Sequence, residues 1–498
     1  MESQQSHNKL HVVFLPYPAI GHMNPMIDTA RLFAKHGVNV TIILTHANAS
    51  RFQKSIDSDV SLGYSIKTQL LQFPSAQVGL PEGIENMNDA TSREMLSKVT
   101  RGVWMLKDSF EVLFKDLQPD CIVTDMMYPW TVESAAKLNI PRIHFCSSSY
   151  FSDCGIYFVR KYKPHYNLVS DTQKFTIPCL PHTVEMTRLQ LCDWERETNV
   201  MTAIFEPNYV SAERSYGSLY NSFHELESDY ENLSKTTIGI KSWSVGPVSA
   251  WANKDDKRKA NRGHTEKSIG KQTELLNWLN LKQNESVLYV SFGSQTRFPH
   301  AQLVEIAHGL ENSGHNFIWV IKKDDKVEDG EGFLQEFEER MKESNKGYII
   351  WDWAPQLLIL DHPATRGIVT HCGWNSILES LNSGLPMITW PVSSEQFYNE
   401  KLLVDVLKIG VPAGAKVNKF WMNITVDEMV RREEITKAVE ILMGSGQESK
   451  EMRMRAKKLG DAAKRTIEEG GDSYNNLIQL IDELKSLKKS KTLDEKAD

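Results

Sequence analysis

The same order of local sequence patterns opens each half of the 498-residue chain. Near the start, residues 11–15 predict a buried strand, a loop rich in proline and glycine follows, and residues 25–36 place apolar side chains at helical spacing. In the second half, residues 286–292 predict a strand and residues 299–312 a helix. A further strand follows each helix. Because a strand that returns after a helix to the same sheet runs parallel to the first, the pattern predicts one parallel sheet in each half.

The expected fold class is therefore α/β, with two Rossmann-like parallel-sheet domains that face a central cleft. Further strands are expected at 38–44, 121–124 and 142–145 in the first sheet and at 317–321, 348–350, 368–370 and 387–389 in the second. We expect an N-terminal domain over residues 1–247, a linker with a charged loop over 248–272, a C-terminal domain over 273–470, and a helix with a tail over 471–498.

Two segments outside the sheets are less specific. Residues 252–272 are charged and have no apolar periodicity, which predicts a mobile surface loop. Residues 475–487 carry apolar side chains on one side of a predicted helix. The sequence leaves open whether this helix packs back on the N-terminal domain or on the C-terminal one.

Composition and charge argue against several classes of protein. Apolar residues make up 41% of the chain and charged residues 24%, as in soluble globular proteins. The formal net charge of −7 argues against general nucleic-acid binding. No window approaches the roughly 18–20 apolar residues of a membrane span, and the polar N-terminus lacks the apolar region of a signal peptide. We therefore expect no integral membrane segment.

The cysteines and histidines do not form a metal or redox motif. The cysteines are Cys121, Cys146, Cys154, Cys179, Cys192 and Cys372. Their scattered spacing in a long chain predicts reduced thiols and a cytoplasmic protein, which we expect to be a monomer. His11, His362 and His371 lack nearby cysteines or carboxylates at ligand spacing, so no metal site is expected.

Polar residues with the chemistry of an anion site follow one predicted strand of the second sheet. In open parallel sheets, ligands bind beyond the carboxyl ends of the strands. The strand 368–370 leads directly into His371, and Gly373 permits a tight turn before the next helix. Asn375 and Ser376 then lie at the N-terminus of that helix, where backbone amides attract anions. This arrangement suits a diphosphate, with His371 as a further donor.

Other residues near this strand have the chemistry to bind the rest of a nucleotide sugar. Glu379 lies on the same helix face as Asn375, and its carboxylate can accept two hydrogen bonds from a ribose diol. Trp353 follows the preceding strand, and its indole can stack on a base. Glu395 and Gln396 follow the next strand and suit sugar hydroxyls. Helix caps and core aromatics are the alternative for any one residue, but not for the whole ordered set.

Residues 353–396 resemble the signature of plant secondary-product glycosyltransferases. The matching elements are WAPQ, the HP and G pair, THCGWNS, the ES step, GLPM, WP and the closing EQ. The resemblance to plant family-one UDP-dependent glycosyltransferases extends over nearly the whole chain, including residues 291–294 (SFGS). It implies the GT-B architecture. Overall, the chain is most similar to legume triterpenoid saponin glycosyltransferases.

The resemblance implies a role for each residue of the signature. The uracil would stack on Trp353, with backbone contacts from Ala354, and the ribose would lie at Gln356 and Glu379. The diphosphate would be bound by His371, Asn375, Ser376 and Ser294. The sugar would face Trp374, Glu395 and Gln396. The terminal Gln396 favours glucose, and Trp374 in place of arginine argues against glucuronic acid. Galactose or another neutral hexose stays open. UDP-glucose would be a co-substrate, and no other cofactor is expected.

The first sheet is expected to supply a catalytic base. His22 lies in the loop after the first strand, with Asn24 and Pro25 expected as the N-cap and first residue of the next helix. Asp125 follows the strand 121–124, again at a carboxyl end. A carboxylate that binds one imidazole nitrogen fixes the tautomer and stabilises the imidazolium formed when the other nitrogen takes a proton.

Family resemblance assigns this dyad to His22 and Asp125, and the sequence does not prove their contact. Asp28, on the following helix, is the competing partner. The expected reaction is an inverting transfer: His22 removes the acceptor proton, the oxygen attacks the anomeric carbon, and UDP leaves. The acceptor group would be a hydroxyl or a carboxyl.

Soft apolar residues in the first half suggest a broad apolar acceptor, with ordinary core packing as the alternative. They are Met87, Met95, Met105, Met126, Met127, Met186, Met201, Tyr150, Phe151, Tyr157 and Phe158. By resemblance the acceptor would be a triterpenoid, as in saponin biosynthesis, and a flavonoid or other phenolic compound is the main alternative.

Three other functions compete with this reading. A nicotinamide-dependent oxidoreductase would need a glycine-rich GxGxxG loop after the first strand, where this chain has PYPAIG. A protein that binds UDP-sugars without catalysis would not need both His22 and Asp125. A PLP-dependent phosphorylase shares the two-domain design, but the sequence has no clear lysine site for that cofactor.

Overall fold

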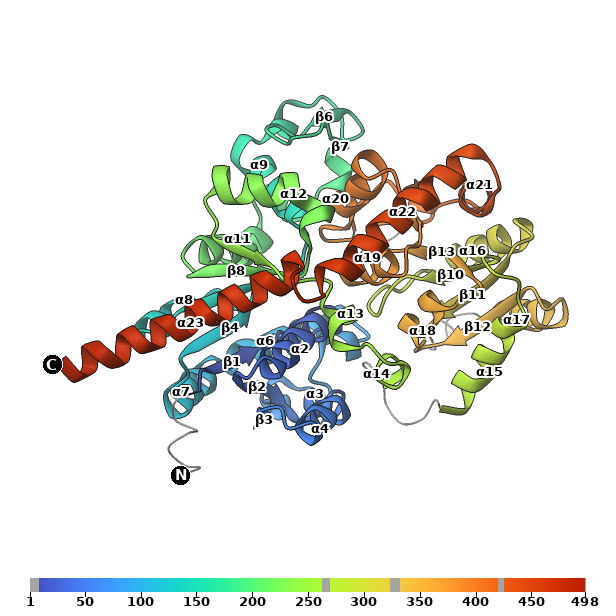
Figure 1. Cartoon of the computed structure of the whole chain (residues 1–498). Helices are drawn as coiled ribbons and strands as arrows, with labels where there is room; N and C mark the ends of the chain where they lie inside the picture. The colour runs from blue at the N-terminus through green and yellow to red at the C-terminus, as the bar shows by residue number, and fades with distance from the viewer. Residues whose placement is uncertain (1–8, 262–268, 323–331, 420–424, 498) are drawn as a thin grey trace.

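The computed structural model describes residues 9–261, 269–322, 332–419 and 425–497, and these form two parallel sheets flanked by helices (Figure 1). The first sheet has the order β3-β2-β1-β4-β5-β8-β9. Its strands are β1 (His11–Leu15), β2 (Asn39–Thr45), β3 (Ile66–Leu71), β4 (Cys121–Asp125), β5 (Arg142–Cys146), β8 (Gly217–Tyr220) and β9 (Ser242–Ser244). The antiparallel pair β6 (Lys174–Thr176) and β7 (Glu185–Thr187) lies apart from it.

The second sheet has the order β12-β11-β10-β13-β14-β15. Its strands are β10 (Val287–Ser291), β11 (Asn316–Ile321), β12 (Gly347–Trp351), β13 (Thr365–Thr370), β14 (Met387–Thr389) and β15 (Gly410–Pro412). All pairings within both sheets are parallel, as the sequence predicts. The predicted α/β fold with two parallel-sheet domains is therefore confirmed.

Helices cover both sheets. In the first half they are α2 (Ile20–Lys35), α3 (His46–Ser50), α4 (Gln53–Ser61), α5 (Ser75–Val78), α6 (Arg93–Met105), α7 (Lys107–Leu117), α8 (Thr131–Lys137), α9 (Tyr150–Tyr162), α10 (Asp193–Arg196), α11 (Val200–Glu213), α12 (His224–Leu233) and α13 (Val248–Ala252). They continue with α14 (Asp256–Asn261), α15 (Ile269–Asn280), α16 (His300–Asn312), α17 (Phe333–Glu343), α18 (Gln356–Asp361), α19 (Trp374–Asn382), α20 (Gln396–Lys401), α21 (Arg432–Met443), α22 (Gln447–Thr466) and α23 (Asp472–Ala497).

Each sheet has its first strand in the interior of the strand order. β1 lies between β2 and β4, and β10 lies between β11 and β13. In both sheets the next strand lies on one side of this strand and a later strand lies on the other, so the strand order reverses there. Such a reversal leaves a crevice at the carboxyl ends of the strands. Leu15 pairs with Thr124, and Ser291 pairs with Thr370. Residues that follow paired strands are therefore neighbours in space, which determines where the site forms.

The two domains share a continuous buried apolar cluster. It runs from α9 and α12 of the first domain to α19, α20 and α22 of the second. Gly155 of α9 lies directly against Tyr398 of α20, since a Cβ at Gly155 would come within 2.8 Å of that ring. The Tyr398 hydroxyl donates to Glu195 at 2.7 Å, and Ser149 donates to Asn399 at 2.9 Å. These contacts fix one domain against the other beside the cleft.

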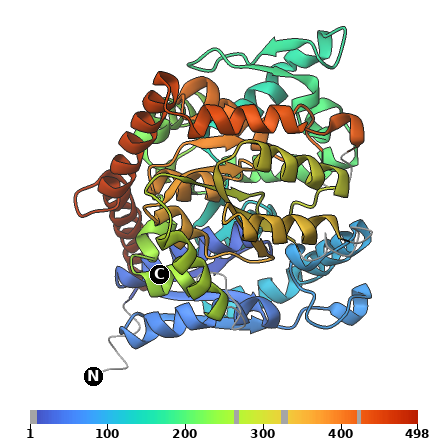
Figure 2. The same ribbon diagram turned by 90° about the vertical axis from the view of Figure 1, so that its right-hand side faces the viewer.

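The C-terminal helix α23 packs on the first domain, which answers the question left open by the sequence. Its buried side chains Leu477 and Leu480 belong to the same apolar cluster as β1 and β2. Tyr216 donates to Glu483 at 2.8 Å, and Asn476 donates to the Ser244 carbonyl at 3.0 Å. Figures 1 and 2 show the chain crossing back from α22 in the second domain to place α23 along the first.

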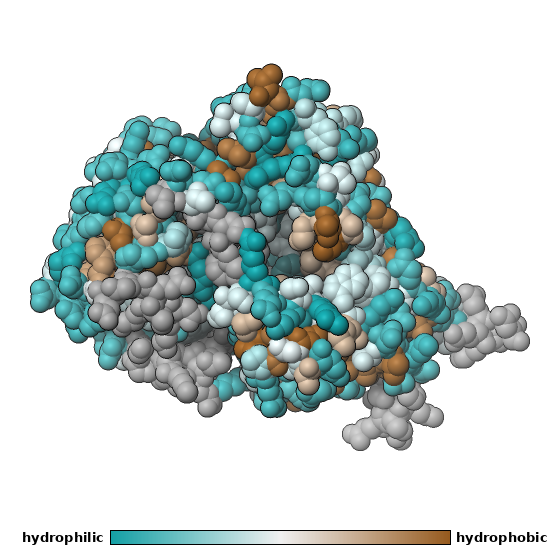
Figure 3. Space-filling view, turned by 180° about the vertical axis from the view of Figure 1, so that it is seen from behind, coloured by the Kyte–Doolittle hydropathy of each residue, from teal (hydrophilic) through white to brown (hydrophobic). Residues whose placement is uncertain are grey.

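The face in Figure 3 is mainly hydrophilic, with small, scattered apolar areas. Within the described residues, no helix is both long enough and apolar enough to cross a membrane.

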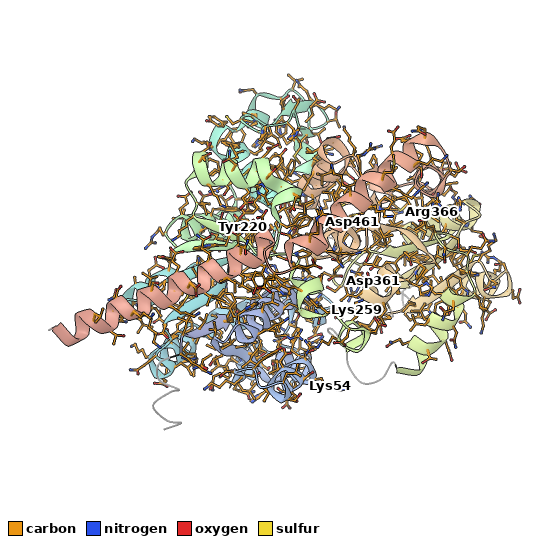
Figure 4. The ribbon with its side chains drawn as sticks, viewed as in Figure 1. Lys54, Tyr220, Lys259, Asp361, Arg366 and Asp461 are labelled. Carbon is orange, nitrogen blue, oxygen red and sulfur yellow. The ribbon has the colours of Figure 1, made fainter. Side chains whose placement is uncertain are left out.

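The predicted loop over 252–272 is wrong in part. Residues 256–261 form α14 and residues 269–272 begin α15, whereas 262–268 lie outside the described residues. Charged residues of α14 have partners in both domains: Arg258 contacts Asp59 at 3.3 Å, and Lys259 contacts Asp361 at 2.7 Å (Figure 4). These distant partners stabilise a helix whose own sequence lacks an apolar face.

We predict that Leu480→Ala destabilises the protein by about 2–5 kcal/mol, because Leu480 is fully buried between α23 and the first domain. Urea unfolding followed by tryptophan fluorescence would measure the change. Leu487→Ala is the matched control on the same helix, since Leu487 is 37% exposed and its loss should change stability by less than about 0.5 kcal/mol. Equal effects of the two substitutions would contradict the packing of α23.

Candidate active site

His22 and Asp125 are in contact where β1 and β4 end. His22 Nδ1 lies 3.0 and 3.1 Å from the two carboxylate oxygens of Asp125. Asp125 is the last residue of β4 and is fully buried, while the His22 side chain is 26% exposed. The Met127 backbone N–H donates to Asp125 at 2.9 Å and holds the carboxylate in place. The imidazole therefore has one nitrogen on a buried carboxylate and an exposed portion for a reactant.

The competing partner, Asp28, lies elsewhere. It is buried and accepts hydrogen bonds from Arg31 and Asn253, both at 3.2 Å. It belongs to a structural network that joins α2 to α13 and the linker. Of the two candidates, the structure brings Asp125 to His22.

The predicted start of the following helix is wrong. α2 begins at Ile20 with Ala19 as its N-cap, so His22 lies in the first helical turn and Pro25 lies inside the helix. The Ile20 N–H donates to Asn88 at 2.8 Å. The first turn thus has a partner that is distant in sequence, which no local capping pattern reveals.

The charges around His22 favour its protonated form. Burial lowers the pKa of His22, but the charge of Asp125, its hydrogen bond and the charge of Glu395 together raise that pKa above its ordinary value. Nδ1–H donates to Asp125, so Nε2 carries the lone pair that can take a proton. Glu395 belongs to the second domain, so its influence on His22 reaches across the cleft.

His371 lies between two glycines at the carboxyl end of β13. A Cβ on Gly293 would come within 2.5 Å of His371 Cε1, and one on Gly373 within 2.4 Å of Nε2. Burial and, to a smaller extent, Lys322 lower the pKa of His371 to about 4. The buried Nδ1 has no partner among the described protein atoms. A neutral imidazole has one N–H that is able to donate a hydrogen bond.

The helix α19 starts at Trp374, three residues after this histidine. Its N-cap is Gly373, which has no side chain to satisfy the first backbone N–H groups, and its first turn carries no acidic residue. Asn375 and Ser376 lie in that turn and are partly exposed. Unfilled amides and the helix dipole together attract an anion at this point.

The residues expected at the ribose also come together. Gln356 Nε2 donates to Glu379 at 2.7 Å and lies 3.3 Å from the Ser376 hydroxyl. The Tyr289 hydroxyl donates to the side-chain oxygen Oε1 of Gln356 at 3.2 Å. Glu379 is buried, and these bonds orient its carboxylate. Trp353 and Ala354 follow β12 at the same edge of the sheet and are partly exposed.

Trp374 does not lie where the sequence predicts it, whereas Glu395 and Gln396 lie at the start of α20, after β14. The Trp374 indole is buried, and its N–H donates to the Asn221 carbonyl of the first domain at 2.8 Å. This side chain does not face the cleft, because it packs between the domains. Glu395 and Gln396 are partly exposed, and Gln396 Oε1 accepts from the Val392 and Ser393 backbone at 2.9 and 3.0 Å. These two bonds fix the Gln396 side-chain oxygen against the backbone of the loop after β14.

Four of the eleven candidate acceptor residues belong to the buried core. Tyr150, Phe151, Phe158 and Met186 are at most 1% exposed and pack in the interdomain cluster. For these four residues the structure supports the alternative of ordinary core packing over a role in acceptor binding. Sequence patterns of period 2 or 3.6 do not separate a core aromatic from one that lines a pocket.

Two polar residues near His22 were missed from sequence. Ser147, which follows β5, lies with its hydroxyl 3.2 Å from His22 Nδ1. Asn88 donates to Ser294 at 2.6 Å, so it joins the first domain to the loop after β10. The position of Ser147 after a strand is a usable signal, but Asn88 lies in an irregular segment with no signal.

Comparison with known proteins supports this description. Residues 82–456 match the family model described as UDP-glucoronosyl and UDP-glucosyl transferase. The chain is 54% identical over 494 residues to the soyasapogenol B glucuronide galactosyltransferase of Glycine max, covering 99% of both chains. It is 44% identical over 486 residues to the UDP-glucose flavonoid 3-O-glucosyltransferase 7 of Fragaria ananassa, covering 97% of this chain and 98% of that protein.

Among solved structures, Glycyrrhiza uralensis UGT73P12 complexed with glycyrrhetinic acid 3-O-monoglucuronide has a similar fold. The TM-score is 0.93 at 51% sequence identity, with 98% of each chain covered.

We predict that Asp125→Asn lowers the pKa of His22. The substitution removes the charge that raises this pKa and leaves the burial that lowers it. NMR titration of the histidine ring protons would measure the change. The partly exposed His362 serves as an internal reference, because its pKa should stay the same. A His22 pKa that is unchanged or higher in the variant would contradict the electrostatic role of Asp125.

We predict that His371→Ala weakens binding of UDP by about 10- to 100-fold, because hydrogen bonds to charged groups contribute roughly 1.5–3 kcal/mol. Calorimetry near neutral pH would measure the dissociation constant. His371→Gln keeps a neutral N–H donor and should retain part of the affinity. Unchanged affinity in His371→Ala would show that the imidazole does not bind the diphosphate.

Proposed function

The chain belongs to the family of UDP-glucoronosyl and UDP-glucosyl transferases, and from this premise we propose that it transfers a hexose from a UDP-sugar to an oxygen of an apolar acceptor, with inversion at the anomeric carbon. The observation that carries this proposal is the approach of two sites from different domains. The His22–Asp125 pair lies at the carboxyl ends of the strands of the first sheet. Asn375, at the start of α19 in the second domain, donates to the carbonyl of Gly21, the neighbour of His22, at 2.5 Å. The proposed base and the proposed anion site therefore lie next to each other, which supports the proposal.

The reaction follows from these positions. His22 Nε2 takes the proton of the acceptor hydroxyl, while Asp125 holds Nδ1–H and stabilises the imidazolium. The acceptor oxygen forms a bond to the anomeric carbon as the bond from that carbon to the diphosphate oxygen breaks. The amides of α19, Asn375, Ser376, Ser294 and the neutral His371 stabilise the charge on departing UDP. A single displacement converts an α-linked donor into a β-glycoside.

The remaining donor contacts are assigned by chemistry. Trp353 stacks on uracil with Ala354 beside it, and Gln356 with Glu379 binds the ribose. Glu395 and the side-chain amide of Gln396, whose oxygen is held by the backbone of its loop, bind the hexose hydroxyls. Trp374 contributes through its backbone amide at the first position of α19, because its indole N–H is already bonded to Asn221.

The sugar and the acceptor are proposed from the sequence and from the named relatives. Gln396 favours glucose, whereas the name of the Glycine max relative supports galactose as the alternative. Triterpenoids are the proposed acceptor class, because that relative and the Glycyrrhiza uralensis enzyme are both named with triterpenoid glucuronides. Flavonoids are the second candidate, which the Fragaria ananassa relative supports.

No cofactor beyond the UDP-sugar is proposed. The free cysteines, of which Cys179 is exposed and the others are buried, support a reducing, cytoplasmic location. We also propose that the enzyme acts as a monomer, which sedimentation analysis would test.

The proposed reaction is tested by mass spectrometry of products from UDP-glucose, UDP-galactose and UDP-glucuronate, each offered with mixed triterpenoids and flavonoids. We expect one added neutral hexose on a triterpenoid hydroxyl, with UDP released in equal amount. Turnover of no donor by the wild-type protein would overturn the proposal.

We predict that His22→Ala lowers kcat for a hydroxyl acceptor by about 10²–10⁴-fold, because the general base is lost. The UDP dissociation constant should stay within about twofold, since the diphosphate residues are intact. A carboxylic acid is already ionised at neutral pH and should lose less rate with the same variant. Near-normal turnover of hydroxyl acceptors would contradict the role of His22.

A further inference from the structure

Two hydrogen-bonded bridges connect the turn that carries His22 to residues proposed to bind the diphosphate. In the first bridge, the Ile20 N–H donates to Asn88 Oδ1 at 2.8 Å, and Asn88 Nδ2 donates to the Ser294 hydroxyl oxygen at 2.6 Å. In the second, Asn375 Nδ2 donates to the Gly21 carbonyl at 2.5 Å. Ile20 and Gly21 directly precede His22, so both bridges end within two residues of the base.

Pro25 makes the second bridge possible. In a helix, the carbonyl of residue 21 accepts from the N–H of residue 25, and proline has no N–H. The Gly21 carbonyl therefore lacks its usual intrahelical donor and accepts from Asn375 instead. A side chain from the second domain completes the backbone bonding of the helix that carries the base.

Asn88 is held firmly enough to act as a bridge. Its backbone N–H donates to Asn86 at 3.0 Å, and Asn86 is fully buried and bonded to Asn48 at 2.7 Å. Met87, which precedes Asn88, donates its backbone N–H to the Pro18 carbonyl at 2.8 Å. The short 3-10 segment η1 (Met87–Asp89) is thus bonded to neighbouring parts of the first domain through Met87 and Asn88.

Both bridges leave a proton for the diphosphate. Ser294 accepts the N–H of Asn88 with a lone pair, so its own hydroxyl hydrogen stays available. Asn375 has two N–H bonds on Nδ2 and uses one for Gly21. Each residue can therefore bind the donor and the His22 turn at the same time.

We propose that Asn88 and Pro25 are positioning residues, which set the place of His22 relative to the leaving diphosphate through Ser294 and Asn375. This inference rests on the proposed glycosyl transfer. Neither residue touches the reacting atoms. Their contribution is the alignment of a base on one domain with a leaving group on the other, and such alignment is a large part of catalysis.

The first test is Asn88→Ala, assayed with two acceptors whose hydroxyl groups differ in acidity. For an aliphatic hydroxyl acceptor we expect kcat to fall by about 10- to 100-fold, because two hydrogen bonds are lost and the base is misplaced. For an acidic phenol that is already ionised, which does not need the base, we expect kcat to fall by less than about threefold. A general structural defect would lower both rates equally and would overturn the proposal.

Asp89→Ala is the matched control in the same segment. Its carboxylate pairs with Arg51 away from Ser294, so both rates should stay within about twofold of wild type. If this variant reproduces the selective loss, the effect belongs to the segment as a whole and the bridge is not its cause.

The second test is Pro25→Ala. Alanine supplies the missing N–H to Gly21 and competes with Asn375, so the protein should be at least as stable as wild type but slower with hydroxyl acceptors. In an Asn375→Ala background, Pro25→Ala should cause no further loss. Additive losses would overturn the second bridge. Wild-type protein that transfers no sugar would defeat the proposed function instead, so the two failures are distinguishable.

Discussion

The contact between His22 and Asp125 is the interaction on which the proposed chemistry depends. It exists because β1 and β4 are adjacent parallel strands, so the residues that follow them emerge side by side. The second sheet repeats this arrangement with β10 and β13, which bring Ser294 and His371 to one edge. For the proposed reaction, these two edges, one from each sheet, must also face each other.

Contacts between the two domains hold these two sheet edges toward each other. The indole N–H of Trp374 bonds to Asn221, and Asn375 in the same helical turn bonds to Gly21. The start of α19 therefore serves as an anion site and as a domain contact. This double use explains why Trp374 is buried although the residues on either side of it are partly exposed.

The sequence predicted the two parallel sheets and the family, because strand periodicity and a signature motif are local signals. Of the strands that it did not predict, β3, β9 and β15 lie at sheet edges, and β8 is an interior strand of only four residues. Their apolar patterns are mixed or very short. The predicted start of α2 was wrong because two distant residues complete the bonding of its first turn. Asn88 accepts from the Ile20 N–H, and Asn375 donates to the Gly21 carbonyl in place of the N–H that Pro25 lacks. Interactions between distant residues leave no periodic trace, and for the same reason Trp374 and α14 were misjudged.

A crystal structure with bound UDP tests the central claim most directly. The account predicts the diphosphate at the N-terminus of α19, against His371 and Ser294, with the uracil on Trp353 and the open end of the site toward His22. UDP bound elsewhere, or at α19 with its diphosphate facing away from the cleft that holds His22, would contradict the account.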